Sequence, residues 1–198
     1  MHRISRLALL FIALILLTGH LHAEQRNPRV ALETNQGRIV LELLPARAPK
    51  TVANFLQYVD EGFYEDTLFH RVIPGFMIQG GGYDKALQRK QAHPAIENES
   101  RNGLKNLKGT VAMARRGDPH SATAQFFINL VDNRHLDATP GRWGYTVFGK
   151  VIKGWDTVEQ IAERPTTRRK GMANVPQQPV VIKAIHRLEQ PDNQADQP

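Results

Sequence analysis

Cysteine is absent from all 198 residues of the chain. The protein therefore has no disulfide framework, no thiol nucleophile and no cysteine to which a lipid could be attached after export. The Gly-x-Ser-x-Gly elbow of serine hydrolases, the His-Glu-x-x-His helix of zinc proteases and the Gly-Lys-Ser/Thr phosphate loop are missing as well. The histidines follow no metal-ligand spacing. We therefore expect neither a metal nor a cofactor, and a hydrolase is the least favoured class of enzyme.

An apolar stretch long enough to cross a membrane is also missing. The longest run, Leu7 to Leu17, follows Arg3 and Arg6, whereas a membrane-spanning helix needs about 20 apolar residues. A basic start, a short apolar run and a following alanine are typical of a secretory signal peptide. We expect cleavage after Ala23, which would leave no stable membrane association. An uncleaved membrane anchor is the alternative.

The remaining composition is that of a soluble globular domain, with 41% hydrophobic and 23% charged residues. A net charge of +7 and a pI near 9.9 raise the possibility of nucleic-acid binding. The basic residues are spread along the chain, however, and only Arg168-Arg169-Lys170 forms a compact run. A solvated loop explains that run more simply, and we expect no nucleic-acid partner.

Hydrophobic periodicity predicts many short strands and two helices. One helix begins near Pro49 and ends at Gly62, and the other covers Asp156–Glu163. The strand-like segments are residues 30–34, 38–43, 68–73, 76–79, 110–114, 126–130, 145–151 and 180–188. Without β-α-β alternation, this pattern favours a mainly β, closed antiparallel barrel. Residues 84–109 lack periodicity and are predicted to be a long surface excursion.

Four segments make up the predicted domain plan. A signal peptide (1–23) and a flexible segment (24–28) precede a single domain (29–189), and a flexible tail (190–198) follows it.

Arg71 is the most unusual residue of the chain, because it lies among large apolar residues. On a strand, Phe69, Arg71 and Ile73 would share one face, and His70 and Val72 the other. Such an arginine either forms a structural ion pair or points into a site, and the residues alone leave both alternatives open.

Three ordered blocks resemble the cyclophilin family of peptidyl-prolyl cis-trans isomerases. The segment Phe69–Gly81 reads FHRVIPGFMIQGG and resembles the cyclophilin signature almost position by position. The other blocks are residues 109–114 with 121–128, and Leu136-Asp137 with residues 145–151. The resemblance is strongest to the periplasmic cyclophilins of Gram-negative bacteria, which implies a periplasmic location.

The resemblance implies an eight-stranded barrel capped by two α-helices, with a proline site on its outer surface. Arg71 corresponds to the catalytic arginine, and Gln79 to the residue that orients it. The resemblance implies that Phe76, Met77, Ala114, Gln125, Phe127, Leu136 and Tyr145 bind substrate, and we add Arg115, which follows Ala114 in the chain.

Three positions depart from the pattern of the best-known eukaryotic cyclophilins. His135 replaces a tryptophan that contacts cyclosporin, so we expect weak cyclosporin binding. Tyr145 replaces a histidine but can still line the pocket. The pair Arg115-Arg116 stands where many relatives have uncharged residues. One hypothesis is that this pair favours substrates with acidic residues just before the proline, by charge complementarity. The simpler interpretation is that the pair belongs to a solvated loop.

The resemblance predicts an enzyme that isomerises X-Pro bonds and assists the folding of exported proteins. A chaperone or scaffold that binds proline-containing segments without turnover is the alternative. In either case the partners are unfolded or partly folded proline-containing polypeptides, and we expect a monomer.

Overall fold

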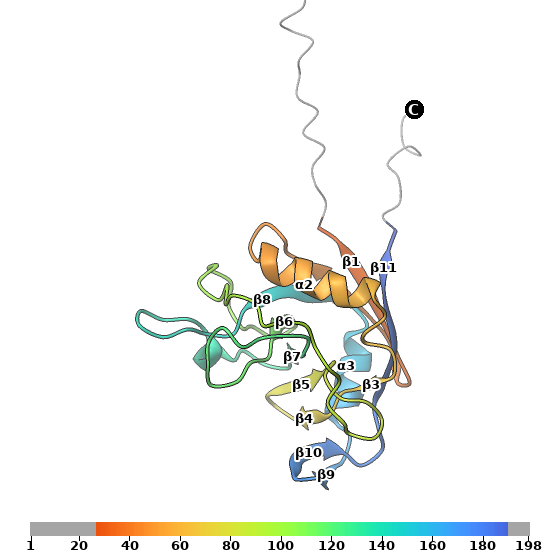
Figure 1. The fold of residues 1–198 in the computed structure, drawn as a ribbon. Coiled ribbons are helices and arrows are strands. Elements are labelled where there is room, and N and C mark those ends of the chain that lie inside the picture. Colours follow the sequence, from red (N-terminus) through yellow and green to blue (C-terminus); the bar gives the residue numbers. More distant parts are fainter. Residues whose placement is uncertain (1–26, 190–198) are drawn as a thin grey trace, which may run out of the picture.

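A computed structural model of the chain describes residues 27–189 (Figure 1). The predicted signal peptide, its cleavage after Ala23 and the tail 190–198 lie outside the described residues. No helix within residues 27–189 is both long and apolar enough to cross a membrane.

The fold is built on one strongly curled antiparallel sheet of nine strands (Figure 1). Their order across the sheet is β3-β11-β1-β2-β8-β6-β7-β5-β4. In chain order the strands are β1 (Arg29–Thr34), β2 (Gly37–Leu43), β3 (Thr67–Leu68), β4 (Arg71–Ile73), β5 (Met77–Gly80), β6 (Thr110–Met113), β7 (Phe126–Asn129), β8 (Val147–Lys153) and β11 (Val181–Leu188).

The two outermost strands of this sheet, β3 and β4, are consecutive in the chain. Only Phe69 and His70 separate them, and β3 pairs with β11 while β4 pairs with β5. At the junction, the Phe69 amide donates to the Val180 carbonyl over 2.9 Å. If β3 and β4 are counted as halves of one strand, the sheet is the predicted barrel of eight strands, and the mainly β prediction is confirmed.

This junction corrects one prediction about the faces of the strand. Simple alternation places Phe69 on the same face as Arg71, but Phe69 is fully buried in the main core together with Val72. Strand geometry stops between β3 and β4, so the alternation of side chains starts again at Arg71. The outward face therefore carries Arg71 and Ile73.

Within residues 27–189, two α-helices pack on the barrel, as predicted. Helix α2 (Pro49–Asp60) has Pro49 in its first turn, where a missing N–H costs no helical hydrogen bond. Its buried face includes Val52, Phe55 and Val59. Gly62 follows the helix with φ +66°, a conformation that glycine adopts without steric cost. Helix α3 (Trp155–Ala162) begins and ends one residue before its predicted bounds.

The structure contains a hairpin and a short helical turn that the sequence analysis did not predict. Strands β9 (Thr166–Arg169) and β10 (Met172–Pro176) form a separate two-stranded sheet, and η1 (Arg134–Leu136) is a single 3₁₀ turn. The run Arg168-Arg169-Lys170 is exposed, as expected, but it belongs to this hairpin and not to a loop. Lys170 and Gly171 both have positive φ, at +48° and +80°, which suits a tight hairpin turn.

Side chains of the sheet alternate between two apolar clusters, and this alternation places the site. On β7, Phe126 and Ile128 enter the main core, whereas Phe127 points to the other face. There it joins Met77, Ala112 and Val147 in a smaller buried cluster. The smaller cluster lies on the outer surface of the barrel, where its partly buried neighbours form the floor of a pocket.

Candidate active site

Strand register brings the central side chains of the site into one row. Arg71 on β4 pairs with Gln79 on β5, and Gln79 pairs with Phe127 on β7. Phe127 in turn pairs with Ala112 on β6. Directly paired residues of an antiparallel sheet project from the same face. The arginine, the glutamine and the phenylalanine therefore stand side by side on the outside of the barrel.

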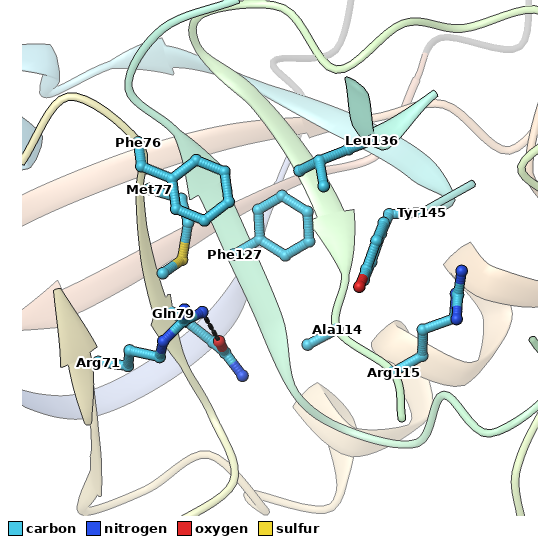
Figure 2. A pocket seen from close by; sticks show the side chains of 9 residues that line it. All are labelled: Arg71, Phe76, Met77, Gln79, Ala114, Arg115, Phe127, Leu136 and Tyr145. Carbon is cyan, nitrogen blue, oxygen red and sulfur yellow. Dashed lines mark hydrogen bonds between the residues drawn. The ribbon is translucent and has the colours of Figure 1, made fainter. Parts of the chain in front are cut away.

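A pocket of about 200 Å³ opens over this row (Figure 2). That volume is small for a drug-sized ligand, for which pockets usually measure about 300 Å³ or more, and it suits a single ring or side chain. Nine of the ten predicted site residues line the pocket: Arg71, Phe76, Met77, Gln79, Ala114, Arg115, Phe127, Leu136 and Tyr145. The tenth, Gln125, lies beside it and contacts Gln79.

Buried side chains and a backbone hydrogen bond fix the apolar wall of the pocket. Met77 and Phe127 are nearly fully buried, and the Phe127 and Tyr145 rings meet edge to face with centroids 5.8 Å apart. The Tyr145 amide donates to the Leu136 carbonyl over 2.9 Å, which fixes η1 against this wall. An aromatic pair of this geometry adds stability beyond its buried area. The wall is thus preformed for an apolar ring.

A chain of hydrogen bonds fixes the polar end of the pocket. Nη1 of Arg71 donates to Oε1 of Gln79 over 3.2 Å, and Nε2 of Gln79 donates to Oε1 of Gln125 over 3.0 Å (Figure 2 shows the first bond). Arg71 forms no ion pair with any acidic residue in the range 27–189. Of the two alternatives for this arginine, the structure therefore favours the one in which it points into a site.

Asn133 also supports the site, and sequence reasoning missed it. Its buried side-chain amide donates to the Phe76 carbonyl and to Oδ1 of Asn129, each over 2.8 Å. These bonds tie the turn before β5 to the end of β7. The available signal was a pair of asparagines, Asn129 and Asn133, next to an apolar strand.

Arg115 corrects the interpretation of its segment as a solvated loop. Its guanidinium donates to the carbonyls of Gly144 and Trp143, each over 3.1 Å, and lies 4.6 Å from the centre of the Tyr145 ring. A cation stacked on an aromatic face stabilises that ring's position. Arg115 thus holds one wall of the pocket, while Arg116 is exposed.

His135 lies at the rim next to Phe76. The two rings stack with centroids 5.7 Å apart and an interplanar angle of 26°. Weak binding of cyclosporin at this position stays a prediction.

Comparison with known proteins agrees with this architecture. The family model described as cyclophilin type peptidyl-prolyl cis-trans isomerase/CLD matches residues 29–187. The chain belongs to this family. The predicted family and enzyme class are confirmed: this cyclophilin is a peptidyl-prolyl cis-trans isomerase.

Three bacterial relatives match this cyclophilin over most of their length. Peptidyl-prolyl cis-trans isomerase cyp18 of Streptomyces antibioticus is 56% identical, covering 78% of this chain and 95% of that protein. Isomerase B of Escherichia coli is 49% identical, covering 79% and 97%. Isomerase A of Dickeya dadantii is 46% identical, covering 82% and 85%.

Solved structures of a Cryptosporidium parvum cyclophilin type isomerase also share the fold of this cyclophilin. One has a TM-score of 0.70 at 28% identity and covers 83% of this chain and 99% of its own. Another, determined in the presence of the dipeptide Ala-Pro, has a TM-score of 0.69 at 28% identity, with 82% and 99% covered.

Proposed function

We propose that this cyclophilin accelerates X-Pro isomerisation in exported polypeptides through a hydrogen bond from Arg71 to the proline nitrogen. The observation that carries the proposal is the placement of the Arg71 guanidinium. It lies at the edge of an apolar pocket sized for one ring, and Gln79 orients it.

The chemistry of the reaction fits what this pocket contains. Rotation about a peptide bond faces a barrier of about 18–20 kcal/mol, which arises from amide resonance. No bond is broken, so the reaction needs neither a nucleophile nor a base. The enzyme has only to bind the twisted amide more tightly than either planar form.

Arg71 can supply this difference in binding. In the twisted state the proline nitrogen becomes pyramidal and gains a lone pair, which accepts a hydrogen bond that the planar amide cannot accept. Arginine remains charged and presents its donors in a rigid fork. The half-buried position of Arg71 strengthens the bond, because a charged donor acts more strongly where water is excluded.

The apolar wall would hold the proline ring while the preceding carbonyl swings round. Met77, Phe127 and Leu136 offer a surface that the ring can enter with little loss of polar contacts. The related isomerase studied in the presence of Ala-Pro supports proline-containing peptides as the substrate class.

The experiment that tests the mechanism compares Arg71→Ala with the parent enzyme in a protease-coupled assay on a proline peptide. We expect kcat/KM to fall by roughly 100-fold or more, as when a preorganised donor is removed from other transition states. Arg71→Lys should restore little activity, because a lysine ammonium cannot reproduce the fork that Gln79 holds. Arg168→Ala, an exposed arginine of β9, is the matched control.

A near-parental rate in Arg71→Ala, with the thermal unfolding curve unchanged, would overturn the mechanism. The same variant separates an enzyme from a simple binder. If it binds proline peptides as tightly as the parent and only turnover is lost, the pocket works as an enzyme. The hydrogen bond from Arg71 to Gln79 supports this outcome, since a binding module would not need an oriented guanidinium.

The export of the protein rests on its N-terminal sequence alone. Arg3 and Arg6 before the run Leu7–Leu17 support export and a cleaved signal, for which the periplasm is the proposed destination. Blots of cell fractions test this: a soluble periplasmic band shortened by about 23 residues is expected. A full-length band in the membrane fraction would indicate an uncleaved anchor.

A further inference from the structure

A second pocket, of about 250 Å³, lies directly beside the proline pocket. The two share Gln79, Ala114 and Arg115. Figure 2 shows these three residues along the same edge of the proline pocket as Arg71, opposite Phe76. A polypeptide bound in the first pocket can therefore extend into the second without leaving the surface.

The charge of the second pocket is of one sign. Among the nine residues that line it, Arg89, Arg115 and Arg116 are basic and none is acidic. The guanidinium of Arg115 is already occupied by four backbone carbonyls. The side chains of Arg89 and Arg116 are exposed and make no hydrogen bond or ion pair with any residue in the range 27–189. Two arginine side chains are thus available to a ligand.

Carboxylates that neighbour these arginines in the chain are held within their own turns. Oδ1 of Asp118 accepts the His120 amide over 2.8 Å, and Oδ1 of Asp84 accepts the Gln88 amide over 2.8 Å. Neither aspartate forms an ion pair within the described part of the chain. Internal neutralisation of Arg89 and Arg116 is therefore absent there, and the positive potential faces the pocket.

The frame of the second pocket is ordered by its own contacts. The Arg116 amide donates to Oγ of Ser121 over 2.8 Å, and this hydroxyl donates to the Asp118 carbonyl over 2.6 Å. On another wall, the Tyr83 ring packs on buried His70 with centroids 4.5 Å apart. A preorganised frame lowers the entropic cost of binding a peptide side chain.

The direction of a bound peptide follows from the position of Arg71. If Arg71 faces the proline nitrogen, the residue bonded to that nitrogen leaves the ring on the Arg71–Gln79 edge. That residue is the one before the proline, and the second pocket borders the same edge. Side chains one or two positions before the proline therefore reach the second pocket.

We propose that Arg89 and Arg116 make the second pocket a specificity pocket for an acidic side chain one or two residues before the proline. The proposal rests on the proposed function, because the direction of the peptide depends on the role of Arg71. It assigns the pair Arg115-Arg116 two separate tasks. Arg115 supports the Tyr145 wall, and Arg116 selects substrate together with Arg89.

The test measures kcat/KM for peptides with Glu, Ala or Lys at each of the two positions before the proline. At about 0.01 M salt, where screening is weak, the parent enzyme should prefer Glu to Lys by roughly five- to twentyfold, as two exposed ion pairs allow. The double variant Arg89→Gln/Arg116→Gln should bring this ratio close to one. Arg168→Gln removes the same kind of charge from the exposed β9 hairpin and should leave the ratio as it is.

Salt gives a second readout, because about 1 M salt shortens the screening length to about 3 Å and should abolish the preference. If the parent turns over the Ala peptide but treats Glu and Lys peptides alike, the specificity proposal is wrong and the proposed function stands. The specificity proposal is also wrong if Arg168→Gln lowers the ratio as much as the double variant, since net charge alone would then explain the effect. If no peptide is isomerised, both proposals fail.

Discussion

At the scale of single residues, the site depends on a glycine that the pocket does not include. A Cβ atom at Gly82 would lie 2.3 Å from Cγ of Gln125, which is far closer than two carbon atoms can approach. Gln125 accepts the hydrogen bond from Gln79, and Gln79 accepts the one from Arg71. The absence of a side chain at Gly82 therefore permits the whole row of polar side chains to form.

We expect Gly82→Ala to lower kcat/KM by roughly 10- to 100-fold, the range that a displacement of about 1 Å at a catalytic group can cause. The backbone at Gly82 is outside the left-handed region, so alanine brings no φ strain. Overpacking of this kind costs about 1–3 kcal/mol, which leaves the protein folded. Gly117→Ala is the matched control, because a Cβ atom there meets nothing within 4 Å.

A double-variant cycle shows whether the glycine acts through Gln125. Gln125→Ala and Gly82→Ala/Gln125→Ala should have the same kcat/KM, since the clash disappears with the glutamine side chain. A parental rate in Gly82→Ala, or a further large loss in the double variant, would contradict this role.

At the scale of elements, helix α2 receives its N-terminal cap from a distant segment. Ala48 precedes the helix and has no side chain that could cap it. Instead, the Glu99 carboxylate accepts the amides of Lys50 and Thr51, over 3.1 and 2.8 Å, and the Thr51 hydroxyl over 2.6 Å. These bonds satisfy free N–H groups of the first turn and place a negative charge at the positive end of the helix.

Loss of this cap should destabilise the protein. We expect Glu99→Ala to lower the free energy of unfolding by about 1–2 kcal/mol, as removal of a cap generally does, in urea denaturation. Glu99→Gln should lose less, because it keeps one acceptor oxygen. Glu97→Ala is the control: Glu97 pairs with Lys50 at the surface and caps no backbone group, so little change is expected. Equal losses in the two alanine variants would argue against capping.

The same helix shows what the sequence could and could not reveal. Pro49, the spacing of Val52, Phe55 and Val59, and Gly62 are local signals, so the bounds of α2 were predictable. The cap from Glu99 was not predictable. Glu99 lies 48 and 49 positions along the chain from the two amides that it accepts, and contacts over such a distance leave no periodic pattern in the sequence. The long excursion 84–109 was recognised as irregular, but its task as a support for α2 becomes visible only in three dimensions.

The candidate site also has parts that the sequence could reveal and parts that it could not. Its strand residues could be placed by alternation and resemblance, and the register then brought Arg71, Gln79 and Phe127 together. Alternation failed at Phe69, because the chain leaves strand geometry at the point where the barrel closes. The part played by Arg115 was also hidden, since a guanidinium that binds carbonyls and one that is solvated look alike in a sequence.

At the scale of the whole molecule, the junction that closes the barrel carries a buried histidine. His70 lies between β3 and β4 and is 5% exposed. Its Nδ1 has no hydrogen-bond partner among the described residues. Burial lowers the pKa of His70 to about 4, and the nearby charge of Arg71 acts in the same direction, while the backbone of Leu68 acts in the opposite direction. The folded state therefore favours the neutral form of His70.

Stability of the barrel should consequently fall with acid in a defined range. The unfolded chain binds a proton at His70 below about pH 6.5, whereas the folded chain resists protonation down to about pH 4. As the pH falls through this range, the unfolded state gains protons that the native state does not, so the native state loses stability. A difference of about 2.5 pH units corresponds to roughly 3 kcal/mol, lost between pH 6.5 and 4 and constant below that.

His70→Gln isolates this contribution, because glutamine keeps a donor but does not titrate. The variant can be less stable at pH 8, but between pH 6.5 and 4 its free energy of unfolding should fall less steeply than that of the parent.

Carboxylates affect stability in a lower pH range. Arg187 lowers the pKa of Asp60 by a direct hydrogen bond, so the stability that Asp60 contributes is lost only as the pH falls below 3.8, the ordinary pKa of an aspartate. Urea denaturation at half-unit pH steps separates the two ranges. Parallel curves for parent and variant from pH 6.5 to 4 would show that His70 is not the group that limits the barrel in acid.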